Sequence, residues 1–154
     1  MKEIGIGVIG TAFMGKAHSI AYTSAGTAFG GNLRPRLEMV CDQDPQIAEA
    51  KRAEMGFARC TTNYMEVVND PKVDLISICV PNSVHKEIAI AALAAGKHVW
   101  CEKPMSTNLV DSQAMVDAAE ASEQKTIVGY NYTQNPLVHA ARDMINEGVI
   151  GEVT

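Results

Sequence analysis

Short apolar runs alternate with helix-like segments along the whole chain, and this alternation limits the fold more than any other feature of the sequence. Two of the runs, 4–9 and 75–80, are nearly continuous in apolar residues. Strands that are covered by helices on both faces have this pattern, which is typical of repeated β-α-β units. We therefore predict an α/β fold, a doubly wound parallel sheet of six strands with helices on both faces.

Capping residues, prolines and glycines mark the ends of these segments. Asp44 and Asn82 occupy N-cap positions, and Gly56 and Gly96 follow helices. We expect a glycine-containing loop, 26–31, between the first helix and the second strand. The predicted strands are 4–9, 37–41, 58–60, 75–80, 98–101 and 126–129, and the predicted helices are 14–25, 45–55, 64–69, 84–95, 110–122 and 137–146.

The pattern changes after Gly129, which divides the chain into two parts. Residues 1–130 hold all six predicted strands, whereas 131–154 read as a connector with one helix and the first strand of a further domain. A single terminal strand without a partner is unfavourable. We therefore expect the chain to be the N-terminal part of a longer protein.

Composition and charge exclude several classes of partner. The net charge is −5 and lysine and arginine form no cluster, which argues against nucleic acid. No apolar run approaches the roughly 20 residues that span a bilayer, and no signal peptide is recognisable, so we expect no membrane and a cytoplasmic location. The four cysteines and four histidines lack metal-ligand spacing, so we expect no metal site. Small molecules remain as the expected ligands.

A glycine loop follows the first predicted strand and opens the first helix. Another frame, 5–10, also spells G-x-G-x-x-G, but its glycines lie inside the strand. In the frame 10–15, Gly10 makes the turn, Gly15 allows the helix to pack closely, and Ala12 replaces the usual second glycine. Free amides at this helix start would hold a pyrophosphate. The candidate residues are Gly10, Thr11, Ala12, Phe13, Met14 and Gly15.

Asp42 ends the second predicted strand, where a carboxylate can accept hydrogen bonds from the adenosine ribose of a dinucleotide. It follows Gly15 by more residues than is usual, and the loop 26–31 would account for the excess. A carboxylate repels a 2′-phosphate, and Gln43 supplies no cation, so NAD is favoured over NADP. The alternative for Asp42 is a simple turn residue before Pro45.

An acid, a base and a proline, Glu102, Lys103 and Pro104, follow the fifth predicted strand. Ligands bind outside the carboxyl ends of parallel strands, which makes Lys103 a candidate working residue. The alternative is a solvated lysine in an ordinary loop.

With the glycine loop, Asp42, the segment 81–85 and Glu102-Lys103-Pro104 in this order, the chain resembles the Gfo/Idh/MocA oxidoreductases, the family of glucose-fructose oxidoreductase and inositol 2-dehydrogenase. The resemblance implies a Rossmann-fold cofactor domain followed by an α+β substrate domain. It implies NAD as cofactor, a small-molecule sugar or polyol substrate, and a homo-oligomer in the full-length protein.

Roles for single residues also follow from this resemblance. Lys103 would be catalytic, relaying the proton of the reacting hydroxyl, and its bond to Pro104 would be cis. Glu102 would hold the nicotinamide ribose. The other residues that would line the cofactor or the cleft are Pro81, Asn82, His85 and Asn131; for His85 a structural role is the alternative, and His18 is assigned a structural role.

Two further functions compete with an NAD-dependent dehydrogenase acting on CH-OH groups. One is a non-catalytic nucleotide-binding regulator of the same fold, and the other is a different two-domain Rossmann enzyme, such as a homoserine dehydrogenase. A regulator needs no base at the hydride site, so Glu102-Lys103-Pro104 favours catalysis.

Overall fold

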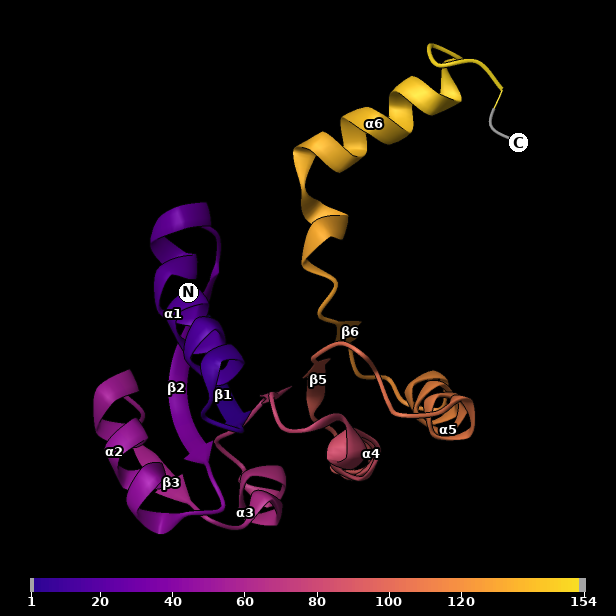
Figure 1. Ribbon diagram of the computed structural model, residues 1–154. Coiled ribbons are helices and arrows are strands. Elements are labelled where there is room, and N and C mark those ends of the chain that lie inside the picture. Colours follow the sequence, from indigo (N-terminus) through magenta and orange to yellow (C-terminus); the bar gives the residue numbers. More distant parts are fainter. Residues whose placement is uncertain (1, 153–154) are drawn as a thin grey trace.

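A single parallel sheet of six strands, in the order β3-β2-β1-β4-β5-β6, forms the centre of the molecule (Figure 1). The computed structural model describes residues 2–152. The order and the parallel pairing confirm the predicted doubly wound sheet. The strands are β1 (Lys2–Ile9), β2 (Leu33–Cys41), β3 (Arg59–Thr61), β4 (Leu75–Ile78), β5 (His98–Cys101) and β6 (Thr126–Val128).

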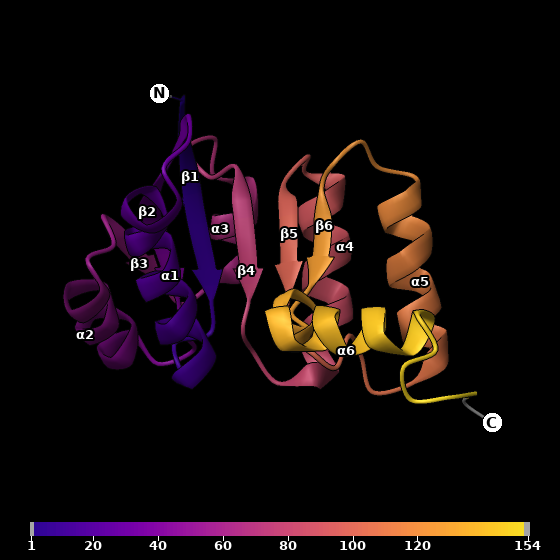
Figure 2. The ribbon, with the colours of Figure 1, turned by 90° about the horizontal axis from the view of Figure 1, so that it is seen from above.

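Helices cover both faces of the sheet and bury two separate apolar cores. One core joins β1 and β2 to α1 and the end of α2, and includes Val8, Val40 and Phe57. The other joins the opposite face to α3, α4 and α5, and includes Ile76 and Ile88 (Figure 2). The helices are α1 (Phe13–Phe29), α2 (Pro45–Met55), α3 (Tyr64–Asn69), α4 (His85–Ala94), α5 (Leu109–Glu120) and α6 (Pro136–Asn146), with short 3-10 turns η1 (Asn82–Val84) and η2 (Asn131–Gln134).

The first helix is longer than predicted, and the expected loop 26–31 is wrong. α1 continues through Gly26 to Phe29. Of the three glycines in the segment 26–31, Gly30 and Gly31 have positive φ, 66° and 97°, whereas Gly26 is helical. Gly26 lies in open space, so nothing around it forces the helix to end there. The long spacing between Gly15 and Asp42 therefore comes from a helix of 17 residues and a strand of nine residues.

The second strand begins four residues earlier than predicted and contains both a proline and a bulge. Pro35 lies where β2 pairs only with β1, because β3 reaches no further than Met39, so its missing N–H costs no bond to β3. Further along, Ile6 pairs with Leu37 and Gly7 with Met39, which leaves Glu38 as the extra residue. Glu38 is buried, and its carboxylate is paired with Arg36 and Arg59.

Two of the predicted helix ends are confirmed and one capping assignment is wrong. The side chain of Asp44 accepts hydrogen bonds from the amides of Gln46 and Ile47 at 2.7 and 3.2 Å, and Gly56 ends α2 with φ 81°. Asn82 is instead the first residue of η1, and α4 starts after Val84 without a side-chain cap. The carbonyl oxygen of Asn82, in the 3-10 turn, accepts the hydrogen bond of the His85 amide, and α4 begins without a capping side chain.

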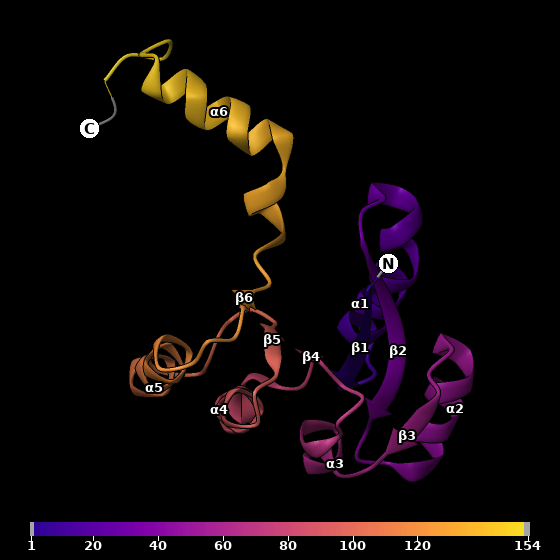
Figure 3. The same ribbon diagram turned by 180° about the vertical axis from the view of Figure 1, so that it is seen from behind.

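The segment after β6 projects away from the sheet (Figures 1 and 3). No residue of η2 or α6 is buried, and Leu137 is 78% exposed. Of the predicted last strand, 151–154, Gly151 and Glu152 are not in a strand, and the last two residues lie outside the described residues.

Replacement of the Asp44 cap tests the start of α2. Asp44→Ala should lower the free energy of unfolding by about 1 kcal/mol, because two amides of the first turn lose their acceptor. Urea denaturation followed by circular dichroism measures the change. Asp44→Ser keeps a capping oxygen and serves as the control; equal stability of the Ala and Ser variants would contradict the capping role.

Candidate functional site

The glycine loop joins β1 to α1 at the carboxyl edge of the sheet. Gly10 has φ 96°, a conformation that favours glycine, and a Cβ there would collide with the backbone of Cys79. A Cβ on Gly15 would collide with the carbonyl oxygen of Gly10. The loop thus has the geometry that the sequence predicted, a tight turn followed by close helix packing.

The start of α1 is open to an anion. Its N-cap is Ala12, which provides no side-chain acceptor, and the first turn contains no acidic residue. The first intrahelical bond runs from the amide of Lys16 to the carbonyl of Ala12, at 3.1 Å, so the amides of residues 13–15 have no acceptor within the helix. Free amides and the helix dipole favour negative charge here. Thr11 is buried beside this turn, whereas Phe13 is 83% exposed.

Asp42 follows β2 and faces the glycine loop. Its Oδ2 accepts a hydrogen bond from the hydroxyl of Thr11, and its Oδ1 accepts one from the amide of Asp44 at 3.3 Å. A pocket of about 330 Å³ lies between this carboxylate and the loops after β1 and β4. Its lining includes the predicted residues Gly10, Ala12, Asp42 and Pro81, together with Thr62, Tyr64 and Glu87.

The segment after β4 contributes Pro81, Asn82 and His85. Pro81 is exposed and Asn82 is half-buried, whereas His85 is completely buried. The ring nitrogens of His85 lie 2.8 Å from the carbonyl oxygen of Val80 and 3.1 Å from that of Pro104. His85 therefore connects the loops that follow β4 and β5, which is the structural role given as its alternative; a contact of its ring with the cofactor stays a prediction.

The turn after β5 separates a buried acid from an exposed base. Glu102 is 6% exposed, and its Oε1 lies 2.9 Å from Nε2 of His18. Lys103 is exposed at the same edge, and its bond to Pro104 is cis, as the family resemblance implied. Oε1 of Glu102 contacts His18, whereas Oε2 forms no hydrogen bond within residues 2–152.

Asn131 lies apart from these residues along the chain but at the same edge. It is the first residue of η2, which follows β6, and it is exposed. The carboxyl ends of β1, β2, β4, β5 and β6 therefore carry all the residues that the sequence singled out.

Sequence reasoning missed four residues of this region. His18 was assigned a structural role, yet it contacts the carboxylate of Glu102. Its signal was a polar residue three positions after Gly15, on the face of α1 that packs against the sheet. Thr62, Tyr64 and Glu87 carry no pattern that distinguishes them, because their place in the pocket depends on how the strands are ordered.

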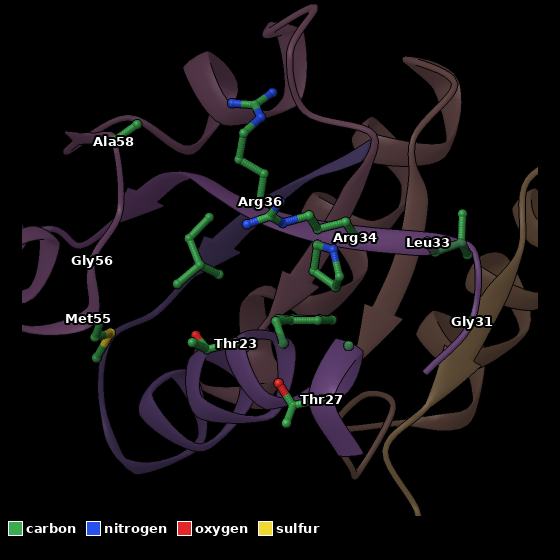
Figure 4. Close-up of a pocket in the computed structure, with 13 residues that line it drawn as sticks. Thr23, Thr27, Gly31, Leu33, Arg34, Arg36, Met55, Gly56 and Ala58 are labelled. Carbon is green, nitrogen blue, oxygen red and sulfur yellow. The ribbon is translucent and has the colours of Figure 1, made fainter. Parts of the chain in front are cut away.

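A larger pocket of about 690 Å³ lies at the opposite end of the sheet, between α1, the start of β2 and the loop after α2. Figure 4 shows Thr23 and Thr27 on its helical side and Arg34 and Arg36 on β2. None of the predicted site residues lines this pocket. The carboxyl edge, which combines an uncapped helix start, a carboxylate and an exposed lysine, is thus the candidate functional site.

Neither a membrane-spanning helix nor a cluster of metal ligands is found in residues 2–152. No helix there has the length and apolar character needed to span a bilayer. In the same residues, histidine, cysteine and acidic side chains form no group of three that could hold a metal ion.

Comparison with known proteins gives consistent matches. The model of a family described as "Oxidoreductase family, NAD-binding Rossmann fold" matches residues 4–130. Levoglucosan dehydrogenase of Pseudarthrobacter phenanthrenivorans is 36% identical over 99% of this chain and 40% of its own length. Inositol 2-dehydrogenase of Rhizobium meliloti is 31% identical over 97% of this chain and 43% of its own length.

Solved structures agree with the sequence matches. The structure of a levoglucosan dehydrogenase in complex with NADH and levoglucosan superimposes with a TM-score of 0.92 at 36% identity, covering 98% of this chain and 41% of that one. This chain thus spans about two fifths of the length of the relatives that it matches.

The cysteines around the site should be unreactive in the folded protein. Burial raises the pKa of the Cys41, Cys79 and Cys101 thiols to about 12, so only about one molecule in ten thousand carries the reactive thiolate at pH 8. Cys60 is half-buried and should react first. Ellman's reagent should therefore titrate at most one thiol in the native protein and four after denaturation. Rapid reaction of a native Cys60→Ser variant would contradict this.

Proposed function

The chain belongs to the Gfo/Idh/MocA oxidoreductase family, with its NAD-binding Rossmann fold, and on that premise we propose that it is the cofactor domain of an NAD-dependent dehydrogenase. The proposed substrate is a sugar, a polyol or a related cyclic hydroxyl compound. One observation carries the proposal: an uncapped helix start, the Asp42 carboxylate and the exposed Lys103 lie along one edge of the sheet. Similarity to levoglucosan and inositol dehydrogenases supports the substrate class.

The residues present fit a dinucleotide. The absence of a Cβ lets Gly10 pack against the backbone of Cys79 and Gly15 against the carbonyl oxygen of Gly10, and the free amides of residues 13–15 at the start of α1 would bind a pyrophosphate. Asp42 would accept hydrogen bonds from the adenosine ribose, and Oε2 of Glu102 from the nicotinamide ribose.

Lys103 would be the acid-base group of the reaction. Bound NAD⁺ supplies the acceptor for the hydride that leaves the substrate carbon. The proton of the same hydroxyl group would pass to Nζ of Lys103, which is exposed at the edge of the sheet and forms no ion pair within residues 2–152. Pro81, Asn82 and Asn131 would border the nicotinamide and the substrate.

A second domain would complete the site. The exposed apolar residues of α6, and Ile127, which is 50% exposed on β6, suggest that further protein covers this side. We therefore assign residues 1–130 to the cofactor domain and 131–154 to the connector and the beginning of an α+β substrate domain. By family resemblance the full-length protein would form a homo-oligomer. Its free cysteines suit the reducing cytoplasm.

Cofactor preference tests the role of Asp42. The full-length protein should use NAD with a higher kcat/KM than NADP, because the Asp42 carboxylate repels a 2′-phosphate. Asp42→Ala should reduce this preference mainly by raising KM for NAD, whereas Asp44→Ser, two residues away, should not. Equal turnover of both cofactors by the wild-type protein would overturn the assignment.

Substitution of Lys103 tests catalysis. Lys103→Ala in the full-length protein should lower kcat about a hundredfold or more, because the general acid-base group is lost, while NADH affinity stays nearly unchanged. Lys51→Ala, at a half-buried lysine that pairs with Glu54 on α2, is the control and should have no effect on kcat. Turnover of the Lys103→Ala variant at the wild-type rate would refute the proposed role, and would favour the nucleotide-binding regulator instead.

A further inference from the structure

A chain of hydrogen bonds runs through the protein interior beneath the Glu102-Lys103-Pro104 turn. Nε2 of His18 lies 2.9 Å from Oε1 of Glu102, and Nδ1 lies 3.1 Å from the hydroxyl of Ser77. The hydroxyl of Ser77 lies 2.7 Å from that of Tyr22. His18, Ser77 and Glu102 are each at least nine-tenths buried. Four polar groups from α1, β4 and the end of β5 thus form one continuous chain.

The chemistry of these groups gives the chain a direction. Burial raises the pKa of Tyr22 to about 12, so its phenol keeps its proton and can donate to Ser77. Ser77 then donates to Nδ1 of His18, and Nε2–H donates to the carboxylate of Glu102. The opposite tautomer would point an imidazole lone pair at a carboxylate oxygen. Each hydroxyl and the imidazole therefore donate once, and the chain ends on the charged group.

Aromatic rings enclose the chain. The ring of Trp100 packs edge-on against His18 at a centroid distance of 5.0 Å and against Tyr22 at 6.5 Å. Gly129 lies beside both Glu102 and Trp100, and a Cβ there would collide with Oε1 of Glu102. Hydrogen bonds are stronger in such a water-poor environment, and a buried carboxylate without its donor would be costly.

We propose that His18, Ser77 and Tyr22 are positioning residues for hydride transfer, and that they act by holding the carboxylate of Glu102. The inference rests on the proposed function. Because His18 contacts Oε1, Oε2 would be the oxygen that accepts a hydrogen bond from the nicotinamide ribose. The backbone of Glu102 is held as well, by a bond of 3.1 Å from its amide to the carbonyl of Ile78, so Lys103 follows a residue that is anchored by both its side chain and its backbone.

Three substitutions in the full-length protein probe the chain. His18→Leu removes the donor to Glu102 and should lower kcat by about ten- to a hundredfold and weaken NADH binding severalfold, because the carboxylate loses its orientation. His18→Gln, whose amide can donate to the same oxygen, should recover most of the loss. Tyr22→Phe keeps the ring packing and should lower kcat a few-fold. Kinetics with a sugar and polyol panel measure these changes, and NADH fluorescence measures affinity.

A double-mutant cycle separates positioning from general stability. Once His18→Leu has broken the chain, adding Tyr22→Phe should change kcat no further, whereas two independent packing defects would add. Thr23→Val is the matched control, because within residues 2–152 the Thr23 hydroxyl bonds only to the carbonyl of Ser19 on the same helix, and it should leave kcat unchanged.

The outcomes distinguish the two proposals. Additive losses, no recovery with His18→Gln, or an equal loss with Thr23→Val would overturn the positioning role. A wild-type protein that binds NADH but oxidises no member of the panel would refute the proposed function. In that case NADH affinity alone tests the positioning role of the hydrogen-bond chain, and unchanged NADH binding by the His18→Leu variant would overturn it.

Discussion

β1 is hydrogen-bonded to a parallel strand on each side and covered by helices on both faces, and the other elements are arranged around this enclosed strand. The chain leaves β1 and β4 toward opposite faces of the sheet, since α1 belongs to one core and α4 to the other. Their loops therefore separate at the carboxyl edge, where strand order reverses and a ligand can enter. The uncapped start of α1 and Asp42 border this opening because they directly follow β1 and β2, at the carboxyl ends of both strands.

Local signals made the sheet and most of the site predictable. Continuous apolar strands, the Asp44 cap and the glycines after helices act within a few residues, and the sequence displays them directly. The length of α1 was missed because Gly26 looks like a helix breaker, although nothing around it ends the helix. The early start of β2 was missed because Pro35 is tolerated there only since β3 does not reach this part of β2. Both errors depend on tertiary surroundings that no local pattern contains.

Two buried histidines approach the same turn from different elements. His18, on α1, meets the side chain of Glu102, and His85, at the start of α4, meets the carbonyl oxygen of Pro104. Lys103 lies between these two anchored neighbours and is itself exposed. The neighbours of Lys103 are anchored while its own side chain is exposed. This arrangement suits a side chain that must reach a reacting atom while the turn stays in place. The partner of each histidine could not be read from the sequence, because it lies more than 15 residues away.

The bulge at Glu38 limits how this chain can vary in length. Side chains alternate between the two faces of a strand, so one extra residue exchanges the faces of everything that follows it. Leu37 packs in the core on the α1 side and Met39 in the opposite core, which marks the exchange. An added residue in the exposed last turn of α1, beyond His18 and Tyr22, would be absorbed before Gly30 and Gly31, whereas loss of one residue from β2 would turn Asp42 from the pocket. The end of the helix can thus vary in length, while the strand must keep its number of residues.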